Sequence, residues 1–441
     1  MSKDWLRRRL GVFDIYSLVH ADSQSTFYFI LGVIAAAAGK YTFWAVLYGT
    51  ALMAAIALAY GEMGSRFPET GGSYLYVKTA LGPLAGFFSA WLLAFDQAIM
   101  VAYGSLDGSL YLFDMLSRYG LAAPPIVPRV FSFAIAVLLF LLTLIGIKES
   151  ARFSAVIATL DIILVGILTV GLGLALGLKT NPPYFSWPSV GSSDILTGLS
   201  YASRGYTGVD AIGQLAGEAE MPLIQVPQAT LLVIGLGAAY GIGLTALMMD
   251  RTSYWDIVRH PATAVLAIAA SLPLGRLLTL PIGVVMALIQ IMAALAGYVA
   301  FSRLLYRLAV DGHLPPLFSR LHKKYRTPHV SLSLILAMAI ALLIPGEIYL
   351  IVDIYAIGSL INYIMVSLAL IIEVRKGGLY GALRSPTIAG ISLVGLLGVA
   401  LTSAGLALAI ITKYREIWIL ALWVLAGLAL LKNKRIRPIK Q

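Results

Sequence analysis

The chain has 441 residues, of which 59% are hydrophobic and 12% are charged, and its formal net charge is +11. This apolar excess is far above that of an ordinary soluble domain and indicates an integral membrane protein. The absence of cysteine excludes disulfides and thiolate metal sites, and the five histidines lack the spacing of metal ligands.

Twelve apolar stretches follow one another with short polar joints, each close to the roughly 20 residues that a helix needs to cross a membrane. They predict an all-α integral membrane protein, with twelve transmembrane helices in a single domain that covers residues 1–441. The predicted helices are 17–38, 42–64, 83–110, 130–147, 153–178, 194–216, 228–249, 277–309, 330–345, 349–373, 387–411 and 416–431.

Most lysines and arginines lie in the segments that face one side of the membrane if the N-terminus is inside. By the positive-inside rule this predicts a multi-pass cell-membrane protein with both termini in the cytoplasm. The basic balance is then explained by topology and by contact with the lipid bilayer, so no nucleic-acid partner is expected.

The first predicted helix contains the stretch "SLVHADSQSTFYFILG", residues 17–32, which places polar side chains inside an apolar segment. Ionisable residues in a membrane helix are costly and tend to face the interior of the bundle, so they are functional candidates. A structural alternative for Asp22 is a pair with His20 or Arg204. The candidates in this stretch are His20, Asp22, Ser23, Gln24, Ser25, Thr26 and Phe27.

The second predicted helix ends in "YGEMGSRFPETGGSYLYV", residues 60–77. Pro68 ends a helix because it lacks the backbone donor, and Gly71-Gly72 permit a tight turn. The turn is expected to place Tyr74 and Tyr76 at the cytoplasmic face.

The third predicted helix carries polar residues at spacings of seven, seven and four, which keeps them on one helical face. This stripe predicts a hydrated pathway, in which Asp96 is a candidate for substrate contact and Asp107 is expected to be solvated near the outer end. The stripe consists of Ser89, Asp96, Tyr103 and Asp107, and a similar face on the tenth helix consists of Tyr355, Ser359 and Asn362.

Asp161 lies in an otherwise apolar helix. A carboxylate there could take up a proton on one side and release it on the other, could bind a cation, or could be bonded to groups of the first or eighth helix. No serine or threonine lies between Gln290 and Ser302 of the predicted eighth helix, so that segment offers no side-chain hydroxyl.

Four motifs in sequence order resemble the amino acid/polyamine/organocation (APC) transporter superfamily. The first is the end of the second helix given above. The others are "LIGIKESARF" (144–153), "YTGVDAIGQLAGEAEMPLIQVPQA" (206–229) and "SRLLYRLAVDGHLPPLFSRLHKKYRTPHVSL" (302–332).

The resemblance implies five helices repeated as five more in inverted topology, over about 10–178 and 194–375, with two extra helices over about 387–431. It also implies that helices one and six are broken near mid-membrane, at residues 23–26 and at Gly205–Gly208. In amino-acid carriers of this superfamily the freed amides hold the substrate carboxylate and the freed carbonyls hold its ammonium group.

The sequence departs from the superfamily at the first break. The usual Gly-Ser-Gly pattern is replaced by Ser23-Gln24-Ser25, and Asp22 lies beside it. Side chains crowd the backbone approach that glycines allow, and an aspartate repels a carboxylate, so a cationic substrate gains weight. Arg204 could instead pair with a substrate carboxylate, or could neutralise Asp22 or Asp96. Substrate contacts from the sixth helix are expected at Arg204, Tyr206, Thr207 and Gly208.

The predicted function is a secondary active transporter, or permease, for an amino acid or related amine. It is expected to work by alternating access as a symporter coupled to protons through Asp161, Asp22 and His20. The alternative is an importer of potassium or another small cation on the same scaffold. An enzyme is not expected, because no nucleophile–base pair, metal cluster or phosphate-binding loop is found, and neither cofactor nor metal is predicted.

Overall fold

The computed structural model of the chain describes residues 10–67, 69, 71–145, 150–176, 193–248, 253–272, 274–345, 351, 354–355, 357–377, 383–412 and 417–432. In its first half the helices are α1 (Val12–Ala38), η1 (Gly39–Tyr41), α2 (Thr42–Arg66), α3 (Gly72–Leu81), α4 (Pro83–Arg118), α5 (Ile126–Ile145), α6 (Ser150–Leu176), α7 (Ser193–Ala202), α8 (Ala211–Leu215) and η2 (Ala216–Glu218).

The second half continues as a helical chain with one small hairpin. Its elements are α9 (Pro222–Met248), α10 (Ser253–Arg259), η3 (Pro261–Thr263), α11 (Ala264–Ala270), α12 (Gly275–Val310), η4 (Pro316–Ser319), α13 (His329–Leu343), α15 (Ile357–Lys376), β1 (Thr387–Ile388), β2 (Ile391–Ser392), α16 (Leu393–Thr412) and α17 (Ile417–Lys432).

Eight helical stretches of the described chain are long and apolar enough to cross a membrane. One of them, Val12–Arg66, joins α1 and α2 through η1. Three further apolar helices are shorter, namely Pro261–Ala270, His329–Leu343 and Trp418–Leu431. The all-α membrane class predicted from the sequence is therefore confirmed. The count of twelve spans and the inverted repeat stay predictions.

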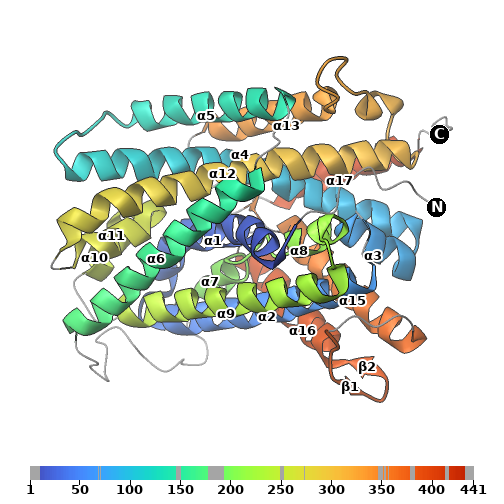
Figure 1. The fold of residues 1–441 in the computed structure, drawn as a ribbon, viewed down its shortest axis with the longest axis horizontal. Helices are drawn as coiled ribbons and strands as arrows, with labels where there is room; N and C mark the ends of the chain where they lie inside the picture. The colour runs from blue at the N-terminus through green and yellow to red at the C-terminus, as the bar shows by residue number, and fades with distance from the viewer. Residues whose placement is uncertain are drawn as a thin grey trace.

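The helices pack around α1, which lies in the middle of the bundle with α4 and α12 on one side of it and α2 and α9 on the other (Figure 1). The two 36-residue helices α4 and α12 pack closely on each other. Small residues permit this approach, because a Cβ at Gly104 would lie 2.5 Å from the Gln290 carbonyl oxygen.

The predicted break in the first helix is wrong, because α1 runs without interruption from Val12 to Ala38. The hydroxyls of Ser25 and Thr26 donate to the Asp22 carbonyl oxygen over 2.7 and 3.1 Å, which satisfies it within the helix. No glycine lies between Gly11 and Gly32 to favour an opened backbone.

The predicted break in the sixth helix is confirmed. The segment α7 ends at Ala202, α8 begins at Ala211, and residues 203–210 between them form turns. Gly208 has a φ of +102°, a backbone conformation that side chains other than that of glycine disfavour. The helix is therefore interrupted where the sequence predicted it, at Gly205–Gly208.

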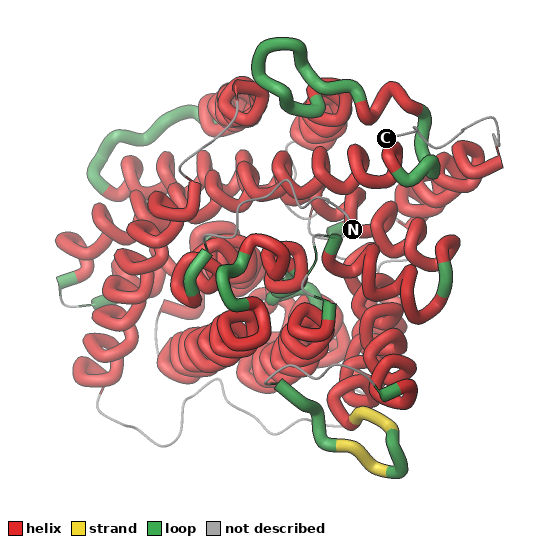
Figure 2. The backbone as a smooth tube through the Cα atoms, turned by 45° about the vertical axis from the view of Figure 1, so that its right-hand side comes forward, coloured by secondary structure: helices red, strands yellow, loops and turns green. Residues whose placement is uncertain are grey.

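Three short helices and a hairpin depart from the prediction. The residues after Gly71 form α3, and they bury Tyr74 and Tyr76 instead of presenting them at a surface. The helices α10 and α11 form in a stretch predicted as a loop. The predicted helix 387–411 begins later, because residues 387–392 form the hairpin of β1 and β2 at the edge of the bundle (Figure 2). Pro68 and residues 146–149 of the "GIKESARF" motif lie outside the described residues.

The two ends of the bundle carry different elements (Figure 1). We call the end with α3 and the junction of α12 and η4 the α3 side. We call the opposite end the cap side, after the segment 253–270 formed by α10, η3 and α11, which packs on α1, α4 and α12.

Candidate functional site

A cluster of hydroxyl groups lies where α1, α4 and the interrupted helix meet. The Tyr103 hydroxyl lies 2.9 Å from the Thr26 hydroxyl and 3.2 Å from the Ser25 hydroxyl. On the other side, Thr207 donates to the Tyr355 hydroxyl over 2.7 Å, and Tyr355 lies 3.4 Å from Thr26. All five side chains are buried. We call Ser25, Thr26, Tyr103, Thr207 and Tyr355 the hydroxyl cluster.

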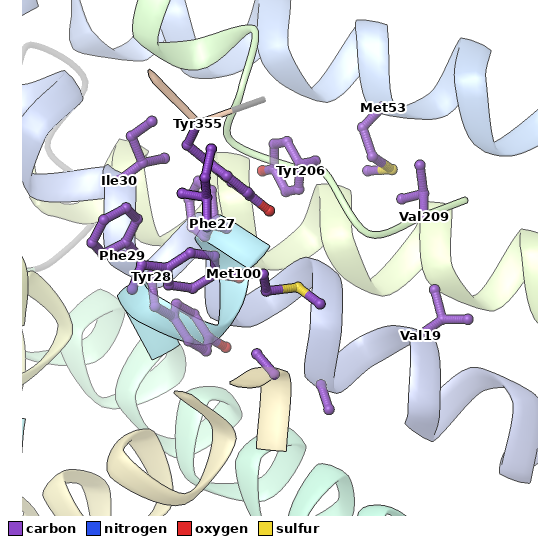
Figure 3. Packing of buried hydrophobic residues seen from close by; sticks show 14 of the residues in the cluster. Val19, Phe27, Tyr28, Phe29, Ile30, Met53, Met100, Tyr206, Val209 and Tyr355 are labelled. Carbon is purple, nitrogen blue, oxygen red and sulfur yellow. The ribbon is translucent and has the colours of Figure 1, made fainter. Parts of the chain in front are cut away.

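Aromatic side chains gather beside this cluster, and Figure 3 shows Phe27, Phe29 and Tyr206 near Tyr355. Phe27 of α1 stacks on Tyr206 of the interruption, with ring centroids 4.9 Å apart and planes 11° from parallel. The Tyr206 hydroxyl is held by Thr50 of α2 at 3.2 Å. Phe29 stacks on Tyr103 at 4.7 Å, so the cluster is covered by apolar ring surface on its α1 side. Phe27 and Tyr206, each predicted as a substrate contact, are therefore brought together.

Asp22 lies directly against the interruption. A Cβ added at Gly208 would overlap the Asp22 carboxylate, so only glycine leaves it room. The carboxylate is buried, and its Oδ1 atom has no hydrogen-bond partner among the described residues. The alternative in which Asp22 pairs with His20 is not found, because the two ring nitrogens of His20 lie against Tyr16 and Asp161. The Arg204 guanidinium lies over the Tyr201 ring, 5.8 Å from its centroid.

Asp161 is joined to two residues of α1. The His20 Nε2 atom lies 2.7 Å from Asp161 Oδ2, and the Tyr28 hydroxyl donates to the same oxygen over 2.9 Å. The other ring nitrogen of His20 lies 2.9 Å from the Tyr16 hydroxyl. Asp161 and His20 are 0% and 1% exposed. Of the alternatives open for Asp161, the structure therefore places it in a hydrogen-bonded pair with the first helix.

A second polar network lies between the hydroxyl cluster and the α3 side. Tyr363 of α15 donates to Asp210 Oδ1 over 3.0 Å, and Gln214 donates to Asp210 Oδ2 over 3.0 Å. Asn362, next along α15, donates to the Tyr60 hydroxyl of α2 over 2.9 Å. These bonds tie the segment after the interruption to α2 and α15.

Two predicted site residues, Asp96 and Gln24, have their contacts outside the hydroxyl cluster. Asp96 accepts a hydrogen bond from the backbone of Ser359 near the start of α15, where a carboxylate complements the helix dipole. The Gln24 side chain lies against α9, because a Cβ at Gly237 would meet its Nε2 atom at 3.3 Å. Ser23 is buried on α1. Substrate contact by these three residues stays a prediction.

The remaining acid of the stripe on α4 differs from expectation. Asp107 is 0% exposed, whereas the sequence suggested a solvated position. It lies one turn beyond Tyr103 toward the cap side, between Gly104 and Gly108, which are the positions of α4 that pack on α12. Among the described residues neither of its carboxylate oxygens has a hydrogen-bond partner.

The α3 side is closed by contacts to Asp311, which follows the end of α12. Asp311 accepts hydrogen bonds from Tyr74 and, over 2.9 Å, from Lys78, both on α3, and Arg307 lies 3.2 Å away. Burial opposes its ionisation, but the Tyr74 and Lys78 bonds outweigh this and hold the pKa of Asp311 below its usual value. Leu10 adds a bridge to Ala219 after η2.

The cap side is closed as well. Thr263 of η3 donates to Asp114 of α4 over 2.7 Å, and Arg118 lies 3.3 and 3.4 Å from Asp114 and Asp256. A Cβ at Gly32 of α1 would overlap the backbone of η3. The hydroxyl cluster is thus enclosed from both ends, which is an occluded arrangement.

Several residues of the site were not predicted from the sequence. Tyr28 and Tyr16 complete the pair of His20 and Asp161, and Thr50 holds Tyr206. The signal for Tyr16 and Tyr28 was their spacing of four and eight residues from His20, which places all three on one face of α1. Groups of three or more acidic, histidine or cysteine residues that could hold a metal ion are not found among the described residues.

Comparisons with known proteins agree with one another. A family model described as "Amino acid permease" matches residues 10–431. The branched-chain amino acid permease BcaP of Bacillus subtilis is 26% identical over 394 residues, which cover 84% of this chain and 82% of the relative. The methylthioribose transporter of the same organism is 25% identical, with 84% and 82% covered. The chloroplastic cationic amino acid transporter 9 of Arabidopsis thaliana is 26% identical, with 73% and 58% covered.

Proposed function

Because this chain belongs to the amino acid permease family of the APC superfamily, we propose that it carries an amino acid or related amine across the membrane by alternating access, in symport with protons. The relatives are named for branched-chain amino acids, for cationic amino acids and for methylthioribose, at nearly equal identity. Sequence identity therefore does not favour one of these substrate classes over another, and the proposed substrate class has to be argued from the chemistry of the site.

The observation that carries the proposal is the hydroxyl cluster beside an interrupted helix. Interruption of a membrane helix frees peptide groups from helical bonds, and such groups persist only where protein, water or a ligand satisfies them. Here they lie beside Thr207, Tyr355 and the buried Asp22 carboxylate. Hydroxyls and peptide amides suit a substrate carboxylate, and Asp22 suits an ammonium group. A substrate with a positively charged nitrogen fits this set best.

The coupling role is proposed for the pair of His20 and Asp161. With one proton more, the pair is an imidazolium next to a carboxylate, and with one proton less it is a neutral imidazole next to that carboxylate. The proton therefore controls the attraction between α6 and α1, and α1 carries two of the five residues of the hydroxyl cluster. Movement of α1 would link proton binding to the substrate site.

We further propose that the α3 side faces the cytoplasm and the cap side faces outward. The contacts of Asp311 would form the inner closure and those of Asp114 the outer closure. Breaking one set while the other remains would expose the hydroxyl cluster to one solution at a time. This is the requirement of alternating access.

A second candidate is a small-cation importer, and the same Asp22 favours it. A buried carboxylate oxygen next to hydroxyl and peptide oxygens is an oxygen-rich environment that also suits potassium. The stacked pair of Phe27 and Tyr206 weighs toward an organic substrate, because ring faces offer dispersion contacts to an alkyl group.

The test is uptake by proteoliposomes that contain the purified chain. Labelled leucine, lysine and methylthioribose are supplied with the interior at pH 7.5 and the exterior at pH 5.5, and rubidium replaces potassium in a parallel set. We expect accumulation of an amino acid that collapses when a protonophore dissipates the gradient. Accumulation of rubidium alone would establish the cation importer instead, and accumulation that ignores the protonophore would remove proton coupling.

A further inference from the structure

The mechanism above makes no use of Asp107, a buried acid of α4. Its two carboxylate oxygens are both inaccessible and both lack a hydrogen-bond partner in the described part of the chain. The other buried acids near the centre differ from it. Asp161 and Asp210 are bonded through one and two oxygens respectively, and Asp96 is bonded to the start of α15. Asp107 is thus the least satisfied of these carboxylates.

An ionised carboxylate that is buried without a partner is costly by several kcal/mol, so such a group is neutral or is paired. No cation is supplied by the neighbours. The helix α12 packs on the neighbouring Gly104 and Gly108, and it has no titratable residue between Leu277 and Gly297. In this closed arrangement Asp107 is therefore in its protonated form.

The other elements around this turn carry few titratable groups. In the cap, residues 261–270 contain none, and those of α10 and its end are Tyr254, Asp256, Arg259 and His260. The cap-side part of α1, residues 27–38, contains only Tyr28, which is bonded to Asp161, and α5 contains only Arg129. Further along α4, Asp114 is paired with Arg118 at 3.3 Å. None of these groups forms a hydrogen bond or ion pair with Asp107 in the part of the chain that the structure describes.

The position of Asp107 connects it to the movement of the cap. Tyr103, one turn away on one side, belongs to the hydroxyl cluster. On the other side Tyr111 lies beside the backbone of Val265 in α11, and Asp114 is bonded to Thr263. When the cap leaves α4, these contacts are lost and water reaches the turn that carries Asp107. A hydrated aspartate has a pKa of about 4 and is therefore ionised at neutral pH.

We propose that Asp107 is a proton-binding site of the cap side, which takes up one proton when the cap closes over α4 and returns it when the cap opens. The inference rests on the proposed function for the direction of the cycle, but its chemistry depends only on Asp107 and the cap. Closing would then be favoured at low pH on the cap side. In an inward gradient this closure would load a proton together with the substrate.

The experiment measures cap opening without any substrate. The chain has no cysteine, so Val265→Cys creates a single thiol, and Val265 is 0% exposed while the cap is closed. The labelling rate with a charged maleimide is measured from pH 5 to pH 8 in detergent. It is divided by the rate of a Leu274→Cys chain, whose position is 65% exposed, to remove the titration of the thiol itself.

We expect the relative rate to rise with pH, by up to about tenfold per pH unit for a one-proton equilibrium. Asp107→Asn should keep the rate flat at its low-pH value, because the amide is neutral like the protonated acid, and Asp107→Glu should restore the slope. Asp194→Asn, at an exposed acid of α7, is the matched control and should keep the wild-type profile.

A flat profile in the Val265→Cys chain itself, or an unchanged slope in Asp107→Asn, would overturn the proposal. If Asp107→Asn does not fold, Asp107→Leu replaces it as a neutral side chain of similar volume, with the same expected flat profile. Since no transport is measured, either result leaves the uptake test of the proposed function unaffected. If the chain accumulates an amino acid but its labelling rate does not depend on pH, the proposed transport function stands and the proton-binding role of Asp107 is wrong.

Discussion

The pair of His20 and Asp161 is the clearest case of chemistry created by contact between distant residues. The two side chains are 141 positions apart in the chain and lie 2.7 Å from each other. Each was a candidate from the sequence because an ionisable residue in a membrane helix is energetically costly and is therefore expected to have a functional role. Their contact changes the role of both, because neither group is isolated and a proton can be shared between them.

Asp161→Asn tests this pair. The amide cannot take up the proton that the carboxylate shares with His20, so we expect gradient-driven accumulation to fall at least tenfold while exchange of substrate at equal pH continues. The measurement is uptake and counterflow in proteoliposomes with and without a pH gradient. Asp194→Asn is the control, and unchanged accumulation with an unchanged pH dependence in Asp161→Asn would remove the coupling role.

At the scale of elements, the interrupted sixth helix and the continuous first helix contribute different groups to the site. The interruption supplies Tyr206, Thr207 and the close approach of Gly208, while α1 supplies hydroxyls from a regular backbone. Serine and threonine can bond back to a helical carbonyl, so polar residues by themselves do not open a helix. The side chains of α1, and not its backbone, face the cluster.

Gly241→Ala tests the packing that orients Tyr206. A Cβ at Gly241 of α9 would overlap the Tyr206 hydroxyl, whereas a Cβ at Gly235 of the same helix meets nothing within 4 Å. We expect Gly241→Ala to shift Tyr206 from its stack on Phe27 and to raise the KM for substrate severalfold. Gly235→Ala should leave the KM unchanged and raise helix stability by up to about 1 kcal/mol. Equal KM values for the two variants would exclude a role for this contact.

At the scale of the whole molecule, closure at both ends defines the state described. The α3 side is held by charged groups around Asp311, and the cap side by Asp114, Arg118 and the packing of Gly32 on η3. Both sets are small and polar compared with the apolar packing of α4 on α12. A carrier that alternates must be able to break either set without unfolding the bundle.

Asp311→Asn tests the closure of the α3 side. Loss of the charge weakens the bonds to Lys78 and Tyr74, so we expect a lower melting temperature at pH 7, equivalent to about 1–2 kcal/mol. The pKa of Asp311 is held below its usual value, so its stabilising contribution is present above the ordinary carboxyl pKa and is lost as the pH falls through the lowered one. The melting curves of the two chains should therefore converge in acid.

The control for this closure is Glu373→Gln, which removes the partner of Lys376 at 2.7 Å near the end of α15. Lys376 is 51% exposed, so a change below about 0.5 kcal/mol is expected. A melting temperature that drops equally in both variants would mean that Asp311 contributes no more than an ordinary surface pair.

The sequence by itself determined the class of the molecule and most of its helices. Length, apolar content and basic asymmetry are properties of local segments, and the bilayer constrains each spanning segment to be a helix. Gly205 and Gly208 likewise predicted the interruption of the sixth helix. The positive φ of Gly208 is a local backbone conformation that glycine allows, so no distant contact is needed to predict it. The candidate acids were visible for the same reason, since each is an exception within its own helix.

Only the tertiary structure decided which side chains meet. The continuity of α1 depends on bonds of Ser25 and Thr26 within the helix and on Gln290 of α12, which donates to the Ser25 carbonyl. The pairing of His20 with Asp161, the capping role of Asp96 and the enclosure of Asp107 depend on helices that are distant in sequence. The physical reason is that burial and partners set the state of a charged group, and both arise from packing between helices.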